Sequence, residues 1–352
     1  MQGGPAVTGG GGVIQALFKH LMMQHKRLIA LGLWASAALM TAPASAQPVP
    51  FGLFGDTPYS AWERDNLPAL ITAMDQEELA FVVHDGDIKN GASECSDAVF
   101  NDILRLFQAS KTPLIYVPGD NEWTDCHRNN NGSYDPMERL NKLRSLFFTG
   151  DSALGQRKLL LQRQSQAGAP AFASYRENVR WEAGGALFVG LNLPGSDNNF
   201  YGTQHKDKHK DKDDPSPEFV ARSAANRAWL AQAFAQARTH KLAGIMVVIQ
   251  ANPEFESINK GKRQPGYDAF VTQLREETQA FAGQVVLVHG DSHSHQINQP
   301  MRDPVSRDVV PNFTRVETLG FPFFGWVKAT VDVRDPKVFQ FAPRPWPKSV
   351  GN

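Results

Sequence analysis

The most constraining feature of this sequence is a short turn containing glycine and aspartate that recurs after four apolar runs. The turns cover residues 54–59, 84–91, 118–123 and 289–295. In an α/β sheet the carboxyl ends of the strands converge on one ligand crevice, so these turns should face a common pocket. Glycine permits the sharp bend that leaves a neighbouring side chain directed into that pocket. The four turns therefore predict one shared acidic site.

Apolar runs typical of strands alternate with helical patterns along most of the chain. The strand-like runs cover 51–54, 80–84, 114–117, 186–191, 243–250 and 284–289, and the helical patterns cover 96–110, 221–240 and 267–281. A polar stretch reaching to residue 78 separates the first two runs. Interleaved helices and strands favour a layered α/β fold, and the antiparallel-like alternation of 315–341 favours mixed sheets. We predict a four-layer α/β/β/α sandwich.

The N-terminal segment has the pattern of a secretory signal peptide. Basic residues at 25–27 precede the apolar run 28–40, and the small residues 44–46 follow it. The apolar run of about 13 residues is shorter than the roughly 20 that a bilayer span needs. We therefore expect cleavage after Ala46, a secreted or periplasmic protein, and no transmembrane segment in the mature chain.

The domain organisation follows from this cleavage site. Residues 1–46 are expected to be an extension plus signal peptide, and residues 47–352 one large domain. Within that domain, the stretch near 203–217 is rich in Lys, His and Asp and reads as a solvated insertion of low complexity.

The charge balance limits the partners. The chain has 36 basic and 36 acidic residues, so no basic excess attracts nucleic acid over a broad surface. A phosphate-bearing ligand, including a nucleotide, must then be held by a local site. No partner protein can be inferred.

The only two cysteines, Cys95 and Cys126, lie 31 positions apart. An oxidising compartment favours a disulfide between them, and two cysteines alone do not make a zinc site. We predict the Cys95–Cys126 bridge, and two buried free thiols are the alternative.

Several carboxylates gathered in one pocket would repel one another unless a cation lay between them. Hard divalent ions are the simplest explanation for such a cluster. A histidine in the last turn, His293, shifts the expected metal towards manganese, iron or zinc rather than calcium.

The order of these blocks resembles the calcineurin-like metallophosphoesterase superfamily over roughly residues 51–300, as a divergent secreted or bacterial branch. The signatures of that superfamily run D-x-H, G-D-x-x-D, G-N-H-[DE], a lone His after a strand, and G-H-x-H. Asp56 stands at the first aspartate with Pro58 at the histidine, and Asp87 stands in the second block with Asn90 at its acid.

The later blocks leave their alignment open. Asp120 or Asn121 takes the place of the ligand Asn in the third block, depending on a one-residue insertion. Gln250 or Asn252 stands for the lone histidine. In the last block either His293, with Asp291 before it, or His295 corresponds to the final histidine.

The resemblance implies two divalent metal ions, Mn, Fe, Zn or Mg, that polarise a phosphate ester and activate water. Asp87 would bridge them. The implied ligands of one metal are Asp56, Asp87 and His293, and those of the other are Asp87, Asp120 or Asn121, Asp291 and Gln250, with His295 as a further candidate. The missing histidines leave proton transfer to Lys89, Asn121 or His84.

Three polar or aromatic residues near the turns are candidates for substrate contact, namely Asn198, Asn252 and Trp123, although Trp123 could instead pack in the core. The expected function is a secreted metal-dependent phosphoesterase acting on phosphomonoesters or phosphodiesters. The alternative is a binding protein that keeps the fold without turnover, because Pro58, Asn121 and Gln250 replace family histidines.

Overall fold

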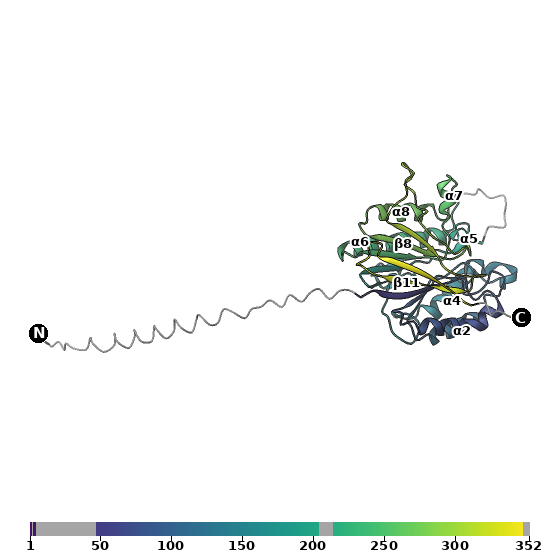
Figure 1. Ribbon diagram of the computed structural model, residues 1–352, viewed down its shortest axis with the longest axis horizontal. Coiled ribbons are helices and arrows are strands. Elements are labelled where there is room, and N and C mark those ends of the chain that lie inside the picture. Colours follow the sequence, from purple (N-terminus) through teal and green to yellow (C-terminus); the bar gives the residue numbers. More distant parts are fainter. Residues whose placement is uncertain (2, 5–46, 204–213, 348–352) are drawn as a thin grey trace. The chain divides into compact units, whose positions relative to one another are not determined.

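Twelve strands in the described part of the chain form two mixed sheets (Figure 1). The computed structural model describes residues 1, 3–4, 47–203 and 214–347. The first sheet has the order β12-β11-β1-β2-β3, with β1 Val49–Phe54, β2 Val82–His84, β3 Leu114–Tyr116, β11 Gly325–Val331 and β12 Phe339–Pro345. The second has the order β4-β5-β6-β7-β8-β10-β9, with β4 Gln162–Arg163, β5 Val179–Ala183, β6 Ala186–Gly190, β7 Gly244–Val248, β8 Gln284–His289, β9 Ile297–Asn298 and β10 Phe313–Glu317.

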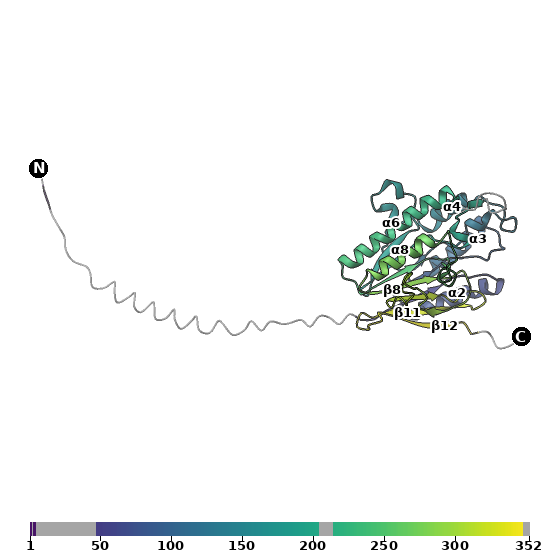
Figure 2. The ribbon, with the colours of Figure 1, turned by 90° about the horizontal axis from the view of Figure 1, so that it is seen from above.

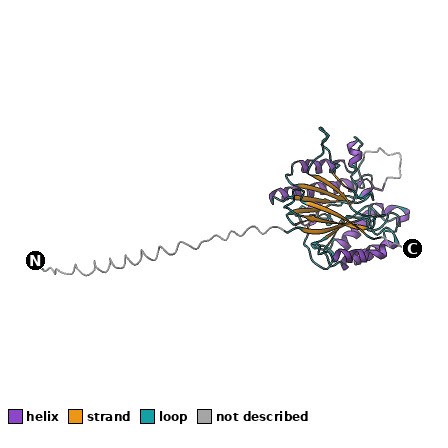
Figure 3. Ribbon diagram, viewed as in Figure 1, coloured by secondary structure: helices purple, strands orange, loops and turns teal. Residues whose placement is uncertain are grey.

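Helices cover the outer face of each sheet, with the strands between them (Figure 3). Those beside the first sheet are α2 Ala61–Asp75, α3 Asp97–Ala109 and α4 Pro136–Phe147, and those beside the second are α6 Pro217–Thr239 and α8 Asp268–Gln279. Two short helices, α5 Gly195–Asn198 and α7 Phe255–Asn259, lie in loops. In the view from above, α6 and α8 lie on the side of β8 that faces away from β11 and β12 (Figure 2).

The helices begin where local sequence supplies a cap. Ser60, Ser96 and Ser216 each accept a hydrogen bond from a backbone N–H in the first turn of α2, α3 and α6. Such caps satisfy amide groups that have no partner within the helix. The polar stretch before residue 78 is therefore the capped helix α2, which buries Leu67, Leu70, Ile71 and Met74.

Three apolar clusters separate the four layers. One packs Phe100, Phe107 and other α-helical residues against the first sheet, and one packs Trp229 and Phe234 of α6 against the second. The third lies between the sheets and includes Phe51 and Phe188, whose rings meet edge to face at 5.2 Å. This arrangement confirms the predicted α/β/β/α sandwich of mixed sheets.

The strand directions bring the predicted turns to one edge. Strands β1, β2 and β3 are parallel to one another, and so are β6, β7, β8 and β10. The loops that carry Asp56, Asp87, Asp120 and Asp291 all leave the carboxyl ends of these parallel strands. The antiparallel pattern predicted for the tail was wrong in one pairing: β10 pairs parallel to β8, although it pairs antiparallel to β9, and β11 and β12 are antiparallel.

The predicted disulfide is present. Cys95 and Cys126 are bonded, with Cα atoms 5.7 Å apart. The bridge encloses α3, β3 and the acidic turn at residues 118–123, and both cysteines are fully buried. It thus fastens the third acidic turn to the start of α3.

Reduction of this bridge is expected to loosen the segment between the second and third acidic turns. Closing a loop of this length contributes about 3–4 kcal/mol in the chain-entropy account. Limited proteolysis with and without reductant should show faster cleavage between residues 91 and 126, and Cys95→Ser/Cys126→Ser should be cleaved fast in both conditions. Equal cleavage rates would show that the bridge does not brace the site.

Two sequence predictions concern residues outside the described part. The predicted signal peptide falls within residues 5–46, and most of the predicted low-complexity insertion falls within 204–213. Among the described residues, none of the helices has the length and apolar character needed to cross a membrane.

Candidate metal and phosphate-ester site

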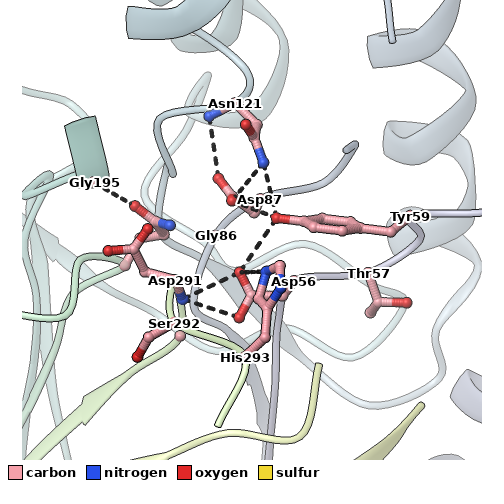
Figure 4. Close-up of polar contacts among 12 residues, drawn as sticks. Asp56, Thr57, Tyr59, Gly86, Asp87, Asn121, Gly195, Asp291, Ser292 and His293 are labelled. Carbon is pink, nitrogen blue, oxygen red and sulfur yellow. Dashed lines mark hydrogen bonds and ion pairs between the residues drawn. The ribbon is translucent and has the colours of Figure 1, made fainter. Parts of the chain in front are cut away.

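Four aspartates from separate loops, Asp56, Asp87, Asp120 and Asp291, meet at the carboxyl edge of the sheets. Figure 4 shows three of them, Asp56, Asp87 and Asp291. The backbone N–H of Asp291 donates to both carboxylate oxygens of Asp56, at 3.2 and 3.0 Å. Asp291 and Asp120 each place an oxygen less than 3 Å from the point where a Cβ on Gly195 would stand. Asp87 joins the group through Tyr59, whose hydroxyl is 2.5 Å from Asp87 Oδ2 and 3.4 Å from Asp56 Oδ1.

Glycines make this close approach possible. A Cβ on Gly119 would lie 2.1 Å from Asp87 Oδ1, and a Cβ on Gly290 would lie 2.3 Å from Asp56 Oδ2. A real Cβ does not tolerate either distance. The glycines of the sequence motifs therefore leave room for carboxylates from other loops, a role beyond that of bending the chain.

The backbone is strained at the same residues. Asp56, Asp87, Asp291 and His293 have φ values of 45°, 60°, 73° and 54°. Residues other than glycine rarely adopt this left-handed backbone conformation, and those that do are often found at functional sites. The strain therefore marks the acidic cluster as a site that the surrounding fold holds in place.

Burial and repulsion by neighbouring carboxylates weaken the acidity of Asp56, Asp87 and Asp291. Burial raises the pKa of Asp56 well above its usual range, and the charges of Asp85 and Asp291 add to the rise. Burial, followed by the charge of Asp120, raises the pKa of Asp87 in the same way and that of Asp291 to about 7. Without a cation, the cluster thus holds protons at a pH where exposed aspartates hold none.

Known structures share this architecture. A dimetal phosphatase from Danio rerio superimposes with a TM-score of 0.50 at 13% identity, over 84% of this chain and 96% of that one. The chain has the metallophosphoesterase fold. PhoD (TM-score 0.49, 12% identity, 81% of this chain and 64% of that one) and the purple acid phosphatase PPD1 from yellow lupin (0.45, 13%, 86% and 55%) are also similar. No protein-family model and no curated protein matches the sequence.

Tyr59, which was not predicted from the sequence, occupies the centre of this metallophosphoesterase-fold site. Besides its bonds to Asp87 and Asp56, its hydroxyl accepts a hydrogen bond from Asn121 Nδ2 at 2.8 Å. Asn121 also donates to Asp87 twice, from Nδ2 at 2.6 Å and from its backbone N at 3.1 Å. Tyr59 stands three positions after Asp56 in the first acidic turn, and this placement was the available signal.

The buried side chains of Glu122 and Lys89 hold the loop that carries Asp87. Glu122 Oε1 accepts hydrogen bonds from the backbone N–H of Asp87 and Gly119 and from the Tyr116 hydroxyl. Lys89 is buried and donates from Nζ to the carbonyl of Asn90. Burial lowers the pKa of Lys89, while Glu122 and Asp87 oppose that effect. The Lys89 ammonium group therefore lies among carboxylates that favour its charge and in a buried setting that disfavours it.

Three residues with predicted roles in proton transfer or substrate contact instead make packing or hydrogen-bond contacts within the fold. His84 is fully buried, and its ring nitrogens bond to the Thr57 carbonyl and the Gly86 N–H. Burial lowers the pKa of His84 to about 4, so this neutral ring braces the turn and is not placed for proton transfer. Trp123 is 0% exposed and packs in the core with Arg222 over its ring. Asn198 is also buried and bonds to Arg222 and to the Gly266 carbonyl.

The remaining candidates line the edge of the cluster. His293 places Nε2 3.8 Å from Asp56 Oδ1, whereas His295 bonds through Nδ1 to the backbone of Glu317. Gln250 accepts from the N–H of Gly195, and the backbone N–H of Asn252 donates to Asp291. The contact with Asp56 favours the alignment that uses His293.

The chemistry of these donors fits a hard divalent cation. Buried aspartates that repel one another are the oxygen ligands that magnesium and manganese prefer. As the described side chains stand, no three of His, Cys, Asp or Glu are grouped so as to hold a metal. The donors from Tyr59 and Asn121 already occupy the oxygens of Asp87, so metal binding would have to displace hydrogen bonds there.

Substitution of Gly195 tests whether a metal ion binds between Asp120 and Asp291, two of the proposed metal ligands. In Gly195→Ala the new methyl would stand 2.6 Å from Asp291 Oδ1 and 2.8 Å from Asp120 Oδ2. We expect the affinity for Mn²⁺, measured by calorimetry, to fall at least about tenfold. Gly150→Ala is the matched control, because no heavy atom lies within 4 Å of its Cβ position. Equal affinity in both variants would place the metal elsewhere.

Proposed function

We propose that this chain is a secreted, metal-dependent phosphoesterase that hydrolyses phosphomonoesters or phosphodiesters. The observation that supports this most strongly is the group of buried aspartates held in strained turns, with pKa values raised by burial and by one another. A protein that kept this arrangement only for stability would be expected to replace the carboxylates with apolar groups.

The proposed metal ligands come from the loops at the carboxyl ends of the strands. Asp56, Asp87 and His293 would hold one divalent ion, and Asp87, Asp291, Gln250 and either Asp120 or Asn121 would hold a second. When bound, such ions polarise phosphate oxygens and lower the pKa of water. In the net reaction, the oxygen of water bonds to phosphorus, the ester P–O bond breaks, and the alcohol is released.

Residues of the chain would orient the phosphate group and balance its charge. The Tyr59 hydroxyl and the Asn121 amide, which contact Asp87, can turn to donate to a phosphate oxygen. Burial, followed by the charge of Asp87, raises the pKa of Tyr59 well above its ordinary value, so this hydroxyl stays protonated. Lys89 would offset part of the negative charge near Asp87.

A binding protein without turnover is the second candidate. Asn121 stands where the family has a histidine, and with Tyr59 it already satisfies the oxygens of Asp87. A fold that no longer takes up metal could keep this closed network.

Hydrolysis assays separate the two candidates. Chelator-stripped protein would be assayed on nitrophenyl phosphate mono- and diesters, with Mn, Fe, Zn, Mg or Ca added singly. Activity restored by one of these metals supports the phosphoesterase. Folded protein that stays silent with all of them supports the binding protein.

A further inference from the structure

An aromatic groove of about 580 Å³ lies beside the acidic cluster. Its lining residues are Ser60, Trp62, Glu63, Leu319, Pro322, Pro345 and the aromatic residues Phe321, Phe323, Phe324 and Trp346. Trp62, Phe321 and Phe323 are 45%, 39% and 52% exposed, so their rings are free to contact a ligand. The volume is that of a site for a small organic molecule.

The strand register places this groove at the edge of the sheet that carries the acidic site. β1 pairs with β11 up to Leu53 opposite Val327, so the loop before Gly325 lies just beyond the end of β1, where Asp56 stands. The backbone N–H of Phe321 donates to the Asp56 carbonyl at 3.1 Å. The ring of Phe321 stacks on Tyr59 at 5.8 Å. The ring pair of Phe321 and Tyr59 thus connects the groove with the hydroxyl that contacts Asp87.

The lining selects an uncharged, apolar occupant. Among the described residues around the groove, none is Lys, Arg or His. Its one carboxylate, Glu63, is buried and accepts hydrogen bonds from the Tyr59 N–H and the Thr57 hydroxyl. A second phosphate or a carboxylate would find no positive partner there and would meet the negative charge of Glu63.

We propose that the groove binds the aryl group of a phosphate ester whose phosphate lies at the acidic cluster. The inference rests on the proposed phosphoesterase function. Aromatic rings contribute beyond their buried area when they meet edge to face or offset, and Trp62 with Phe324 already shows such a pair at 5.3 Å.

An aryl ester also needs no proton donor for its leaving group, and Asn121 at the reacting centre cannot act as one. Asn121, whose amide donates to Asp87, carries no proton that it can release. A phenol has a pKa of about 10 and leaves as its anion more easily than an ordinary alcohol. Water adds its oxygen to phosphorus, and the ester bond electrons leave on the phenolate oxygen. The protons of water pass to solvent and to the products.

The test compares 2-naphthyl phosphate with phenyl phosphate, whose phenols have similar acidity. The second ring should raise kcat/KM about five- to tenfold through a lower KM, because it buries more apolar surface. Trp62→Ala and Phe323→Ala, both exposed positions, should remove most of that preference, so that the two esters are hydrolysed with nearly equal kcat/KM. Val305→Ala is the matched control, since this side chain is 89% exposed and lies outside the groove.

Each outcome bears on a different claim. A naphthyl preference lost in the groove variants but kept in Val305→Ala supports the aryl subsite. Hydrolysis with equal kcat/KM for both esters overturns the subsite alone. The subsite is also overturned if the protein binds phosphatidylcholine vesicles through Phe323 but shows no preference for the naphthyl over the phenyl ester. The groove would then be a lipid-facing surface. No hydrolysis of any ester overturns the proposed function itself, and the subsite with it.

Discussion

Asp87→Asn is expected to reduce metal-dependent hydrolysis at least about 100-fold while the fold stays intact. Asp87 is the carboxylate proposed to bridge both metal ions. Both of its oxygens lie in the buried network with Tyr59 and Asn121. Asn has nearly the same shape but lacks the negative charge that bridging needs.

The measurement is kcat/KM on a nitrophenyl phosphate in the presence of the activating metal, with near-ultraviolet circular dichroism as the check on folding. Asp65→Asn, an exposed position on α2, is the matched control and should keep full activity. Wild-type turnover in a folded Asp87→Asn variant would remove Asp87 from the bridging role.

A second large effect is expected in the stability of the chelator-stripped protein. Burial raises the pKa of Asp291 and Asp125 to about 7, compared with about 4 for an unfolded aspartate. Such groups bind protons more tightly in the folded state, so their contribution to stability is largest below pH 4 and is lost as the pH rises to about 7. We expect Tm to fall by about 5 °C or more between pH 5 and pH 8.

Excess Mn²⁺ should restore most of this loss at pH 8, because a cation that binds only the folded state replaces the missing protons. Scanning calorimetry at several pH values, with and without Mn²⁺, measures both effects. The decline should be smaller in Asp291→Asn and unchanged in Asp65→Asn. A Tm that is flat from pH 5 to pH 8 and insensitive to Mn²⁺ would contradict the account of a strained acidic cluster.

The strand ends of this site could be predicted from sequence because each apolar run is short and is followed within two residues by a glycine. Gln284–His289 was predicted with the bounds that β8 has, and the turns after β1, β2, β3 and β8 do share one edge. The parallel pairing of β10 could not be predicted, since strand direction depends on the chain's route across the sheet and not on local alternation.

Single side chains were harder to place than strands. Tyr59 was missed because its role depends on a hydroxyl reaching Asp87, 28 positions along the chain. His84 and Trp123 stand next to acidic turns in sequence, but the alternation of a strand and the packing beneath a turn point them into the core. Nearness to a motif in sequence therefore indicated the right loop without deciding which side chains face the acidic cluster.

The central claim is that the acidic cluster takes up divalent metal, and anomalous diffraction from crystals grown with Mn²⁺ tests it most directly. The account predicts anomalous density among Asp56, Asp87, Asp120 and Asp291, with the Tyr59 hydroxyl no longer bonded to Asp87. Crystals without anomalous density there, in which Tyr59 and Asn121 still donate to Asp87, would contradict it.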